Sequence, residues 1–173
     1  MRARLGILAV ATLALAACGS TGSSGSSGTT SSQPAATASA SAAAAKAAFG
    51  APFDLGSGVS VTISKPAAFT PGAYASNYMQ GQVANLVTVD VENKGTSPLD
   101  MTTVILSATS GANSCSDILD GDNGINGAPT DPVAAGGHTT FKYGIACDGK
   151  AGAPLDLNVA FGNSSVDLTG TLA

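Results

Sequence analysis

The sequence of 173 residues predicts an all-β domain, an antiparallel β-sandwich of about seven or eight strands that follows a disordered N-terminal tether. Three observations predict this fold class. From about Phe49 onward, apolar and polar residues alternate with a period of two in six separate runs. Turn-forming Gly, Asn, Asp and Pro residues separate the runs, and no stretch of this part shows a clear 3.6-residue period.

The first seventeen residues, 1–17, are typical of a lipoprotein signal peptide. Arg2 and Arg4 precede an uncharged, mostly apolar run that is too short to span a membrane stably. The run ends in Leu-Ala-Ala-Cys at 15–18, which resembles the bacterial lipobox, where small residues precede a cysteine that becomes lipidated and N-terminal. We therefore predict that Cys18 carries palmitate and related acyl chains, which hold the protein in the cell membrane at its extracytoplasmic face. A plain signal peptide with an incidental cysteine is the alternative.

Residues 18–48 are predicted to be the lipidated cysteine and a flexible linker. Gly, Ser, Thr and Ala occupy 27 of the 30 positions over 19–48, so this segment has no large apolar side chains to bury. As a flexible coil it would reach roughly 30 Å. The alanine-rich part, from about 35 to 48, has helix propensity, but its alanines have no partner face and we assign it to the linker. The folded domain is therefore predicted over 49–173.

Six alternating runs predict the strands of this domain. Each run has one apolar and one polar face, which favours antiparallel strands over buried parallel ones. No tryptophan occurs in the sequence, so "immunoglobulin-like" describes the architecture of the predicted sandwich and not an antibody-type Cys-Trp-Cys core. The runs fall at residues 59–63, 87–92, 104–108, 140–147, 155–161 and 166–172.

The charge of the chain excludes some classes of partner. The formal net charge is -4, and only 10% of residues are charged. Without the two arginines of the signal peptide, five lysines stand against eleven acidic residues, which gives -6. An acidic chain without a basic cluster is not expected to bind nucleic acid or to use a polybasic membrane patch.

The three cysteines predict one disulfide. If Cys18 is lipidated, Cys115 and Cys147 remain as an even pair in an oxidising compartment. Closing this loop of about 32 residues would stabilise the fold by roughly 3–4 kcal/mol. A redox or metal-binding thiol pair is the alternative, but the sequence contains no Cys-x-x-Cys and its only histidine is His138.

Motifs that carry catalysis are missing from the sequence, which predicts no enzyme and no cofactor. There is no Gly-x-Ser-x-Gly, His-Glu-x-x-His, phosphate-binding loop or dinucleotide fingerprint. His138 follows two glycines and is expected to be a solvated residue at a turn. The only glutamate, Glu92, lies on the polar face of an alternating run and is expected to be exposed.

An acidic segment over 117–131 is the place where any ligand would be expected. Asp120-x-Asp122 resembles the opening of a calcium-binding loop, which uses oxygen ligands at alternate positions. The pattern departs from such a loop at its fifth, sixth and twelfth positions, which hold Gly124, Ile125 and Asp131. We predict a turn-rich connection without a metal. If calcium were bound, the candidate ligands would be Asp120, Asp122 and Asp131.

Two segments resemble a known family. LVTVDVENKGTSPLD, at 86–100, is similar to the signature of a bacterial domain-of-unknown-function family, in which a valine-rich strand runs into Asn-x-Gly and a Pro-led strand. VAAGGHTTFKYGIAC, at 133–147, resembles the second hallmark of that family, with Ala-Ala-Gly-Gly in place of the usual Pro-Gly turn. The resemblance covers about residues 50–173.

The resemblance implies a location and an architecture. Such domains commonly follow a lipobox and a tether in surface lipoproteins of actinobacteria and other Gram-positive bacteria. They are similar in fold to a secreted mycobacterial immunogen and have no established active site. Together with the residues above, this predicts a membrane-anchored extracytoplasmic lipoprotein that acts as a non-catalytic binding module for an envelope protein or glycan. The alternatives are a structural envelope spacer without a ligand and an accessory domain of a secreted enzyme.

Overall fold

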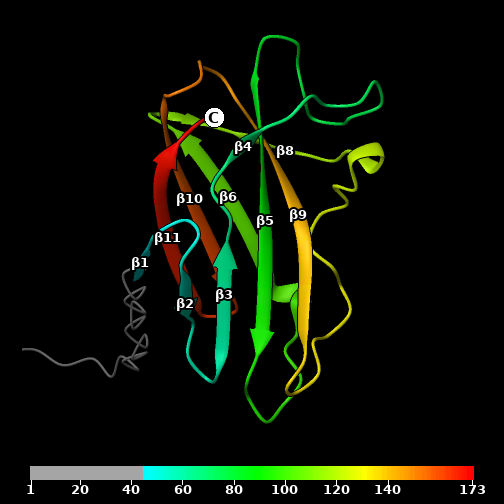
Figure 1. Cartoon of the computed structure of the whole chain (residues 1–173), viewed down its shortest axis with the longest axis vertical. Helices are drawn as coiled ribbons and strands as arrows, with labels where there is room; N and C mark the ends of the chain where they lie inside the picture. The colour runs from blue at the N-terminus through cyan, green and yellow to red at the C-terminus, as the bar shows by residue number, and fades with distance from the viewer. Residues whose placement is uncertain (1–44) are drawn as a thin grey trace, which may run out of the picture. The chain divides into compact units, whose positions relative to one another are not determined.

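The computed structural model describes residues 45–173, which fold as a two-sheet β-sandwich (Figure 1). The predicted signal peptide, Cys18 and nearly all of the predicted linker lie outside the described residues. Within 45–173 the structure has no α-helix, and thus none there is long and apolar enough to cross a membrane.

Both sheets contain strands from distant parts of the chain. The strand order of the first sheet is β1 (Ala45–Ala47), β11 (Ser164–Thr171), β10 (Pro154–Phe161), β6 (Val104–Ser110) and β7 (Asn113–Ser114). That of the second is β2 (Pro52–Asp54), β3 (Val59–Ile63), β5 (Val83–Asn93), β9 (His138–Cys147) and β8 (Ser116–Ile118), with β4 (Ala67–Ala68) also pairing with β5. Two short 3-10 turns complete the described elements, η1 (Met101–Thr103) and η2 (Gly121–Asn123). All strand pairs are antiparallel except β1 with β11.

The predicted all-β sandwich is confirmed, and the six alternating runs correspond to its longer strands, β3, β5, β6, β9, β10 and β11. Period-two alternation appears directly as burial. In β10, Leu155, Leu157 and Val159 are fully buried between exposed or half-buried neighbours. In β6, Ile105 is 64% exposed while Leu106 lies in the core. The core between the sheets thus consists of aliphatic and aromatic side chains from both.

The described fold begins at Ala45, which is four residues before the predicted start of the domain at 49. Ala45–Ala47 forms β1, parallel to β11, with Ala45 opposite Val166 and Ala47 opposite Leu168. A strand is joined to a sheet by its backbone amides, so small side chains do not prevent pairing. The argument that these alanines have no partner face therefore does not apply to β1.

The inward face of β5 has an asparagine near each end and valines between them. Asn93 is buried, and its Nδ2 donates to the carbonyl oxygens of Ser97, Val133 and Ala134 at 2.9–3.2 Å. Asn85 is fully buried, and its Oδ1 accepts from the Ala173 backbone N–H at 2.7 Å. We call the two ends of the sandwich the Asn93 end and, after Cys115–Cys147, the disulfide end.

The turn Asn93-Lys94-Gly95 at the end of β5 needs a glycine because it lies in close contact with another backbone segment. Gly95 N–H donates to the Asn93 Oδ1 at 3.0 Å. A Cβ at Gly95 would lie only 2.7 Å from the Ser57 carbonyl oxygen, in the turn between β2 and β3. A side chain at position 95 would therefore force two backbone segments apart.

Candidate functional site

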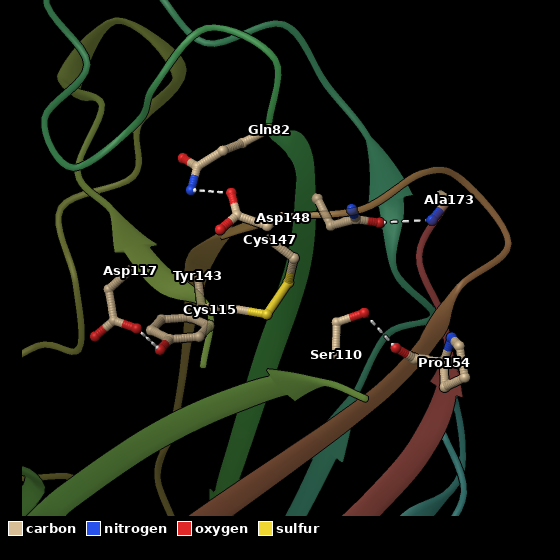
Figure 2. The surroundings of a disulfide bond; sticks show 10 residues. Gln82, Ser110, Cys115, Asp117, Tyr143, Cys147, Asp148, Pro154 and Ala173 are labelled. Carbon is tan, nitrogen blue, oxygen red and sulfur yellow. Dashed lines mark hydrogen bonds between the residues drawn. A yellow bond between two sulfur atoms is a disulfide. The ribbon is translucent and has the colours of Figure 1, made fainter. Parts of the chain in front are cut away.

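The disulfide end is built around the Cys115–Cys147 bond, which the structure contains (Figure 2). Cys147 is the last residue of β9 and is fully buried, in agreement with its predicted inward position. Cys115 lies between β7 in the first sheet and β8 in the second. The disulfide thus fixes the point at which the chain passes from one sheet to the other.

A tyrosine next to the disulfide joins both sheets. Tyr143 is buried in β9, and its hydroxyl donates to the Asp117 carboxylate in β8, as Figure 2 shows. The same hydroxyl oxygen lies 3.2 Å from the Leu106 carbonyl oxygen in β6. Burial, together with the adjacent Asp117 carboxylate, raises the pKa of Tyr143 far above its usual value. The phenol is therefore neutral at any physiological pH and acts here as a hydrogen-bond donor.

Asp120 is a structural residue in this arrangement. It is buried, and its carboxylate accepts from the Gly72 backbone N–H and from the Asn123 side-chain amide, both at 2.7 Å. These two hydrogen bonds, the one from Gly72 first, lower the pKa of Asp120 below its usual value. Asp120 is also the N-cap of η2, and Gly124 follows this turn in the left-handed conformation.

The other two candidate metal ligands differ in position. Asp122 is exposed, and a Cβ at Gly72 would lie 3.2 Å from its carboxylate and 3.1 Å from that of Asp120, so these two carboxylates are neighbours. Asp131 is also exposed. Over residues 45–173, no group of three His, Cys, Asp or Glu side chains is arranged to hold a metal ion. Asp120 and Asp122 are thus brought together without a third ligand of this kind.

The loop 69–82, between β4 and β5, packs on a small satellite core that the sequence did not predict. This core lies on the outer face of the second sheet, where Phe69, Ala75 and Tyr78 cover Ala84, Ile118 and Ala146. Three aromatic residues and one methionine in a stretch without any charge are the signal that could have indicated it. An open hollow of about 670 Å³ lies beside the loop, lined by Asn77, Tyr78, Met79, Cys115, Ser116 and Asp117.

The polar face of the second sheet holds the remaining residues considered for chemistry. His138 and Glu92 are exposed, as the sequence predicted for each of them, but His138 is the first residue of β9, paired with Glu92, and not part of a turn. Glu92 pairs with Lys94 at 3.0 Å. With the exposed Asp90 of β5, the sheet brings together one imidazole, two carboxylates and one ammonium group on an open surface, where water screens their charges.

Comparisons with known proteins reveal a likeness of fold only. No protein-family model matches the chain, and no curated protein sequence matches it significantly. A crystal structure named "putative lipoprotein (ycdA)" from Bacillus subtilis is similar with a TM-score of 0.55 and 19% identity, over 69% of this chain and 38% of that one. The chain thus spans well under half the length of the Bacillus protein. An uncharacterized beta-sandwich protein from Clostridium difficile has a TM-score of 0.47 and 13% identity, over 73% of this chain and 93% of that one.

Proposed function

We propose that the protein is an extracytoplasmic lipoprotein, anchored in the cell membrane through Cys18, whose sandwich is a non-catalytic binding module of the envelope. The observation that carries the proposal is the pairing of two of the three cysteines. Cys115 and Cys147 are joined to each other, and the third cysteine of the sequence is Cys18, at the end of the lipobox-like Leu-Ala-Ala-Cys. A disulfide also fits an oxidising compartment.

Two further observations support it. The Bacillus subtilis protein of similar fold is named a "putative lipoprotein", which agrees with the proposed anchor. His138 and Glu92 lie with Ser60, Thr62, Asp90 and Lys94 on an open sheet face, where water screens their charges and weakens the electrostatic interactions on which catalysis depends. In a binding module, by contrast, the loops that connect the strands contact the ligand, and the sandwich holds them in position.

Labelling with palmitate in cells that naturally make the protein tests the anchor. We expect label on the wild-type chain and on a Cys115→Ser/Cys147→Ser variant, and none on Cys18→Ser, which should also leave the membrane fraction. Mass spectrometry should find a mature N-terminus at Cys18 with added acyl mass. Unlabelled wild-type protein, or a Cys18→Ser chain that stays in the membrane, would overturn the proposal.

A further inference from the structure

The exposed apolar side chains of the disulfide end lie on two neighbouring segments. Tyr74 and Met79, in the loop 69–82, are 91% and 66% exposed, and Leu119, directly after β8, is 46% exposed. Backbone hydrogen bonds in both directions between Ser76 and Leu119, at 2.8 and 3.4 Å, join the two segments. We call their exposed apolar and acidic side chains the Tyr74 surface, which consists of Tyr74, Met79, Leu119, Asp117 and Asp122.

Firm support lies beneath the loop that carries Tyr74. The loop packs on the satellite core through three side chains, and its Gly72 N–H is bonded to the buried Asp120. Asn77 Nδ2 donates to the Asp117 carbonyl oxygen at 3.1 Å, and Gln82 Nε2 donates to Asp148 at 3.1 Å. Figure 2 shows the Gln82–Asp148 contact beside the disulfide. A surface held in this way is already ordered before it meets a partner, so binding costs little conformational entropy.

The charge around these apolar side chains is negative. The segments 69–82 and 115–124 together contain three aspartates and no lysine or arginine. Lys142 lies beside the second segment, and its Nζ donates to the Asn123 carbonyl oxygen at 2.9 Å. The Asp117 and Asp122 side chains are exposed. Such a surface attracts cationic groups and repels both anionic lipid headgroups and a second copy of itself.

From this combination we infer that the Tyr74 surface docks a protein partner that presents an apolar side chain within a surface rich in lysine or arginine. The inference rests on the proposed function, because it names the surface through which the envelope module would bind. Exposed, rigidly supported aromatic side chains are the commonest anchors of such interfaces. Of the four large hydrophobic side chains exposed within residues 45–173, three lie here, and the fourth, Ile105, is on the outer face of the first sheet.

Photo-crosslinking on living cells that naturally make the full chain tests this docking. A photoreactive amino acid replaces the exposed Gln80, next to Met79, and a matched one replaces the exposed Ser107, near Ile105. We expect a discrete adduct with one other protein from position 80 and none from position 107. Mass spectrometry then identifies the partner, whose surface should contain clustered lysine or arginine.

Variants of the surface, titrated with the purified partner, give the second measurement. Tyr74→Ser should weaken binding at least about tenfold, whereas Ile105→Ser, which changes a mostly exposed hydrophobic residue elsewhere, should not change it. Asp122→Lys should slow association several-fold, and raised salt should do the same for the wild type. Both serine variants alter side chains that are mostly exposed, so their thermal unfolding midpoints should match that of the wild type and show that the fold is intact.

Several results would overturn the inference. An adduct of two copies of this chain would show self-association, and an adduct with lipid would show a membrane surface. Identical adducts from positions 80 and 107, no adduct from position 80, an acidic partner, or unchanged binding by Tyr74→Ser would each contradict it. Palmitate on Cys18 without an adduct at position 80 would overturn the docking alone. An adduct at position 80 on a chain that carries no lipid would overturn the anchor alone.

Discussion

The two ends of the sandwich are both firmly held, but by different means and with different results at the surface. At the Asn93 end, one buried amide side chain bonds to four backbone groups, and Gly95 lets two turns meet at backbone distance. At the disulfide end, a covalent bond, the buried Asp120 carboxylate and a satellite core support the loops. The turns of the Asn93 end thus bond to one another, whereas the disulfide end is firmly held and still leaves Tyr74 exposed. The exposure of Tyr74 at the disulfide end is therefore not a sign that the loops there are poorly packed.

Among the variants that would test this difference between the two ends, removal of the disulfide should lower the free energy of unfolding most. Cys115→Ala/Cys147→Ala should lower the free energy of unfolding by about 3–4 kcal/mol, because the unfolded chain regains the entropy of an open loop. Urea titration of the oxidised wild type and of the double variant measures the change. The hydrogen bonds at the Asn93 end do not depend on this bond, so partial unfolding in the variant should begin at the disulfide end, as hydrogen exchange would show. Equal protection at both ends would contradict the view that the disulfide acts locally.

Asn93→Ala should have the next largest effect, with Asn85→Ala as its counterpart at the other end of β5. Asn93→Ala leaves three carbonyl groups and one backbone N–H without their partner, and we expect a loss of about 3 kcal/mol. Asn85 accepts one hydrogen bond, from the Ala173 backbone N–H, and its Nδ2 has no partner within residues 45–173, so Asn85→Ala should cost only about 1 kcal/mol. Urea titration of both variants compares them directly. Equal losses would mean that hydrogen-bond number does not distinguish the two ends.

Gly95→Ala should destabilise the Asn93 end by about 1–3 kcal/mol, because the added Cβ would clash with the Ser57 carbonyl oxygen in the turn between β2 and β3. Gly121→Ala, at the disulfide end, is a matched control, since the nearest atom to its Cβ would be 3.9 Å away. Thermal unfolding of the two variants checks this pair. A stable Gly95→Ala protein would show that the turns at 57 and 95 can separate at little cost.

The sequence predicted the features that depend on a repeating residue pattern or on the number of residues of one type. Period-two alternation located the six longer strands, and cysteine number predicted the Cys115–Cys147 pair. The strands of two or three residues are too short to show a period, which is why β8 and the other short strands were not predicted. Asp120 was considered only as a metal ligand, because its main donor, Gly72, is 48 residues away in the sequence. Long-range hydrogen bonds of this kind leave no local pattern.

The smallest expected effect is the pH dependence that Asp120 gives to the disulfide end. Because Gly72 and Asn123 lower its pKa in the folded state, the charged carboxylate stabilises the fold at any pH above its unfolded value of about 3.9. That contribution should disappear as the pH falls through the lower folded value. Asp120→Asn removes the charge, so the wild type should be the more stable protein at neutral pH, and the difference should shrink below about pH 4. Urea titrations of both proteins from neutral pH to about pH 3 measure it, with the exposed Asp122→Asn as the control. A difference that stays constant over this range would mean that shape and hydrogen bonding at position 120, and not its charge, hold the loop 69–82 in place.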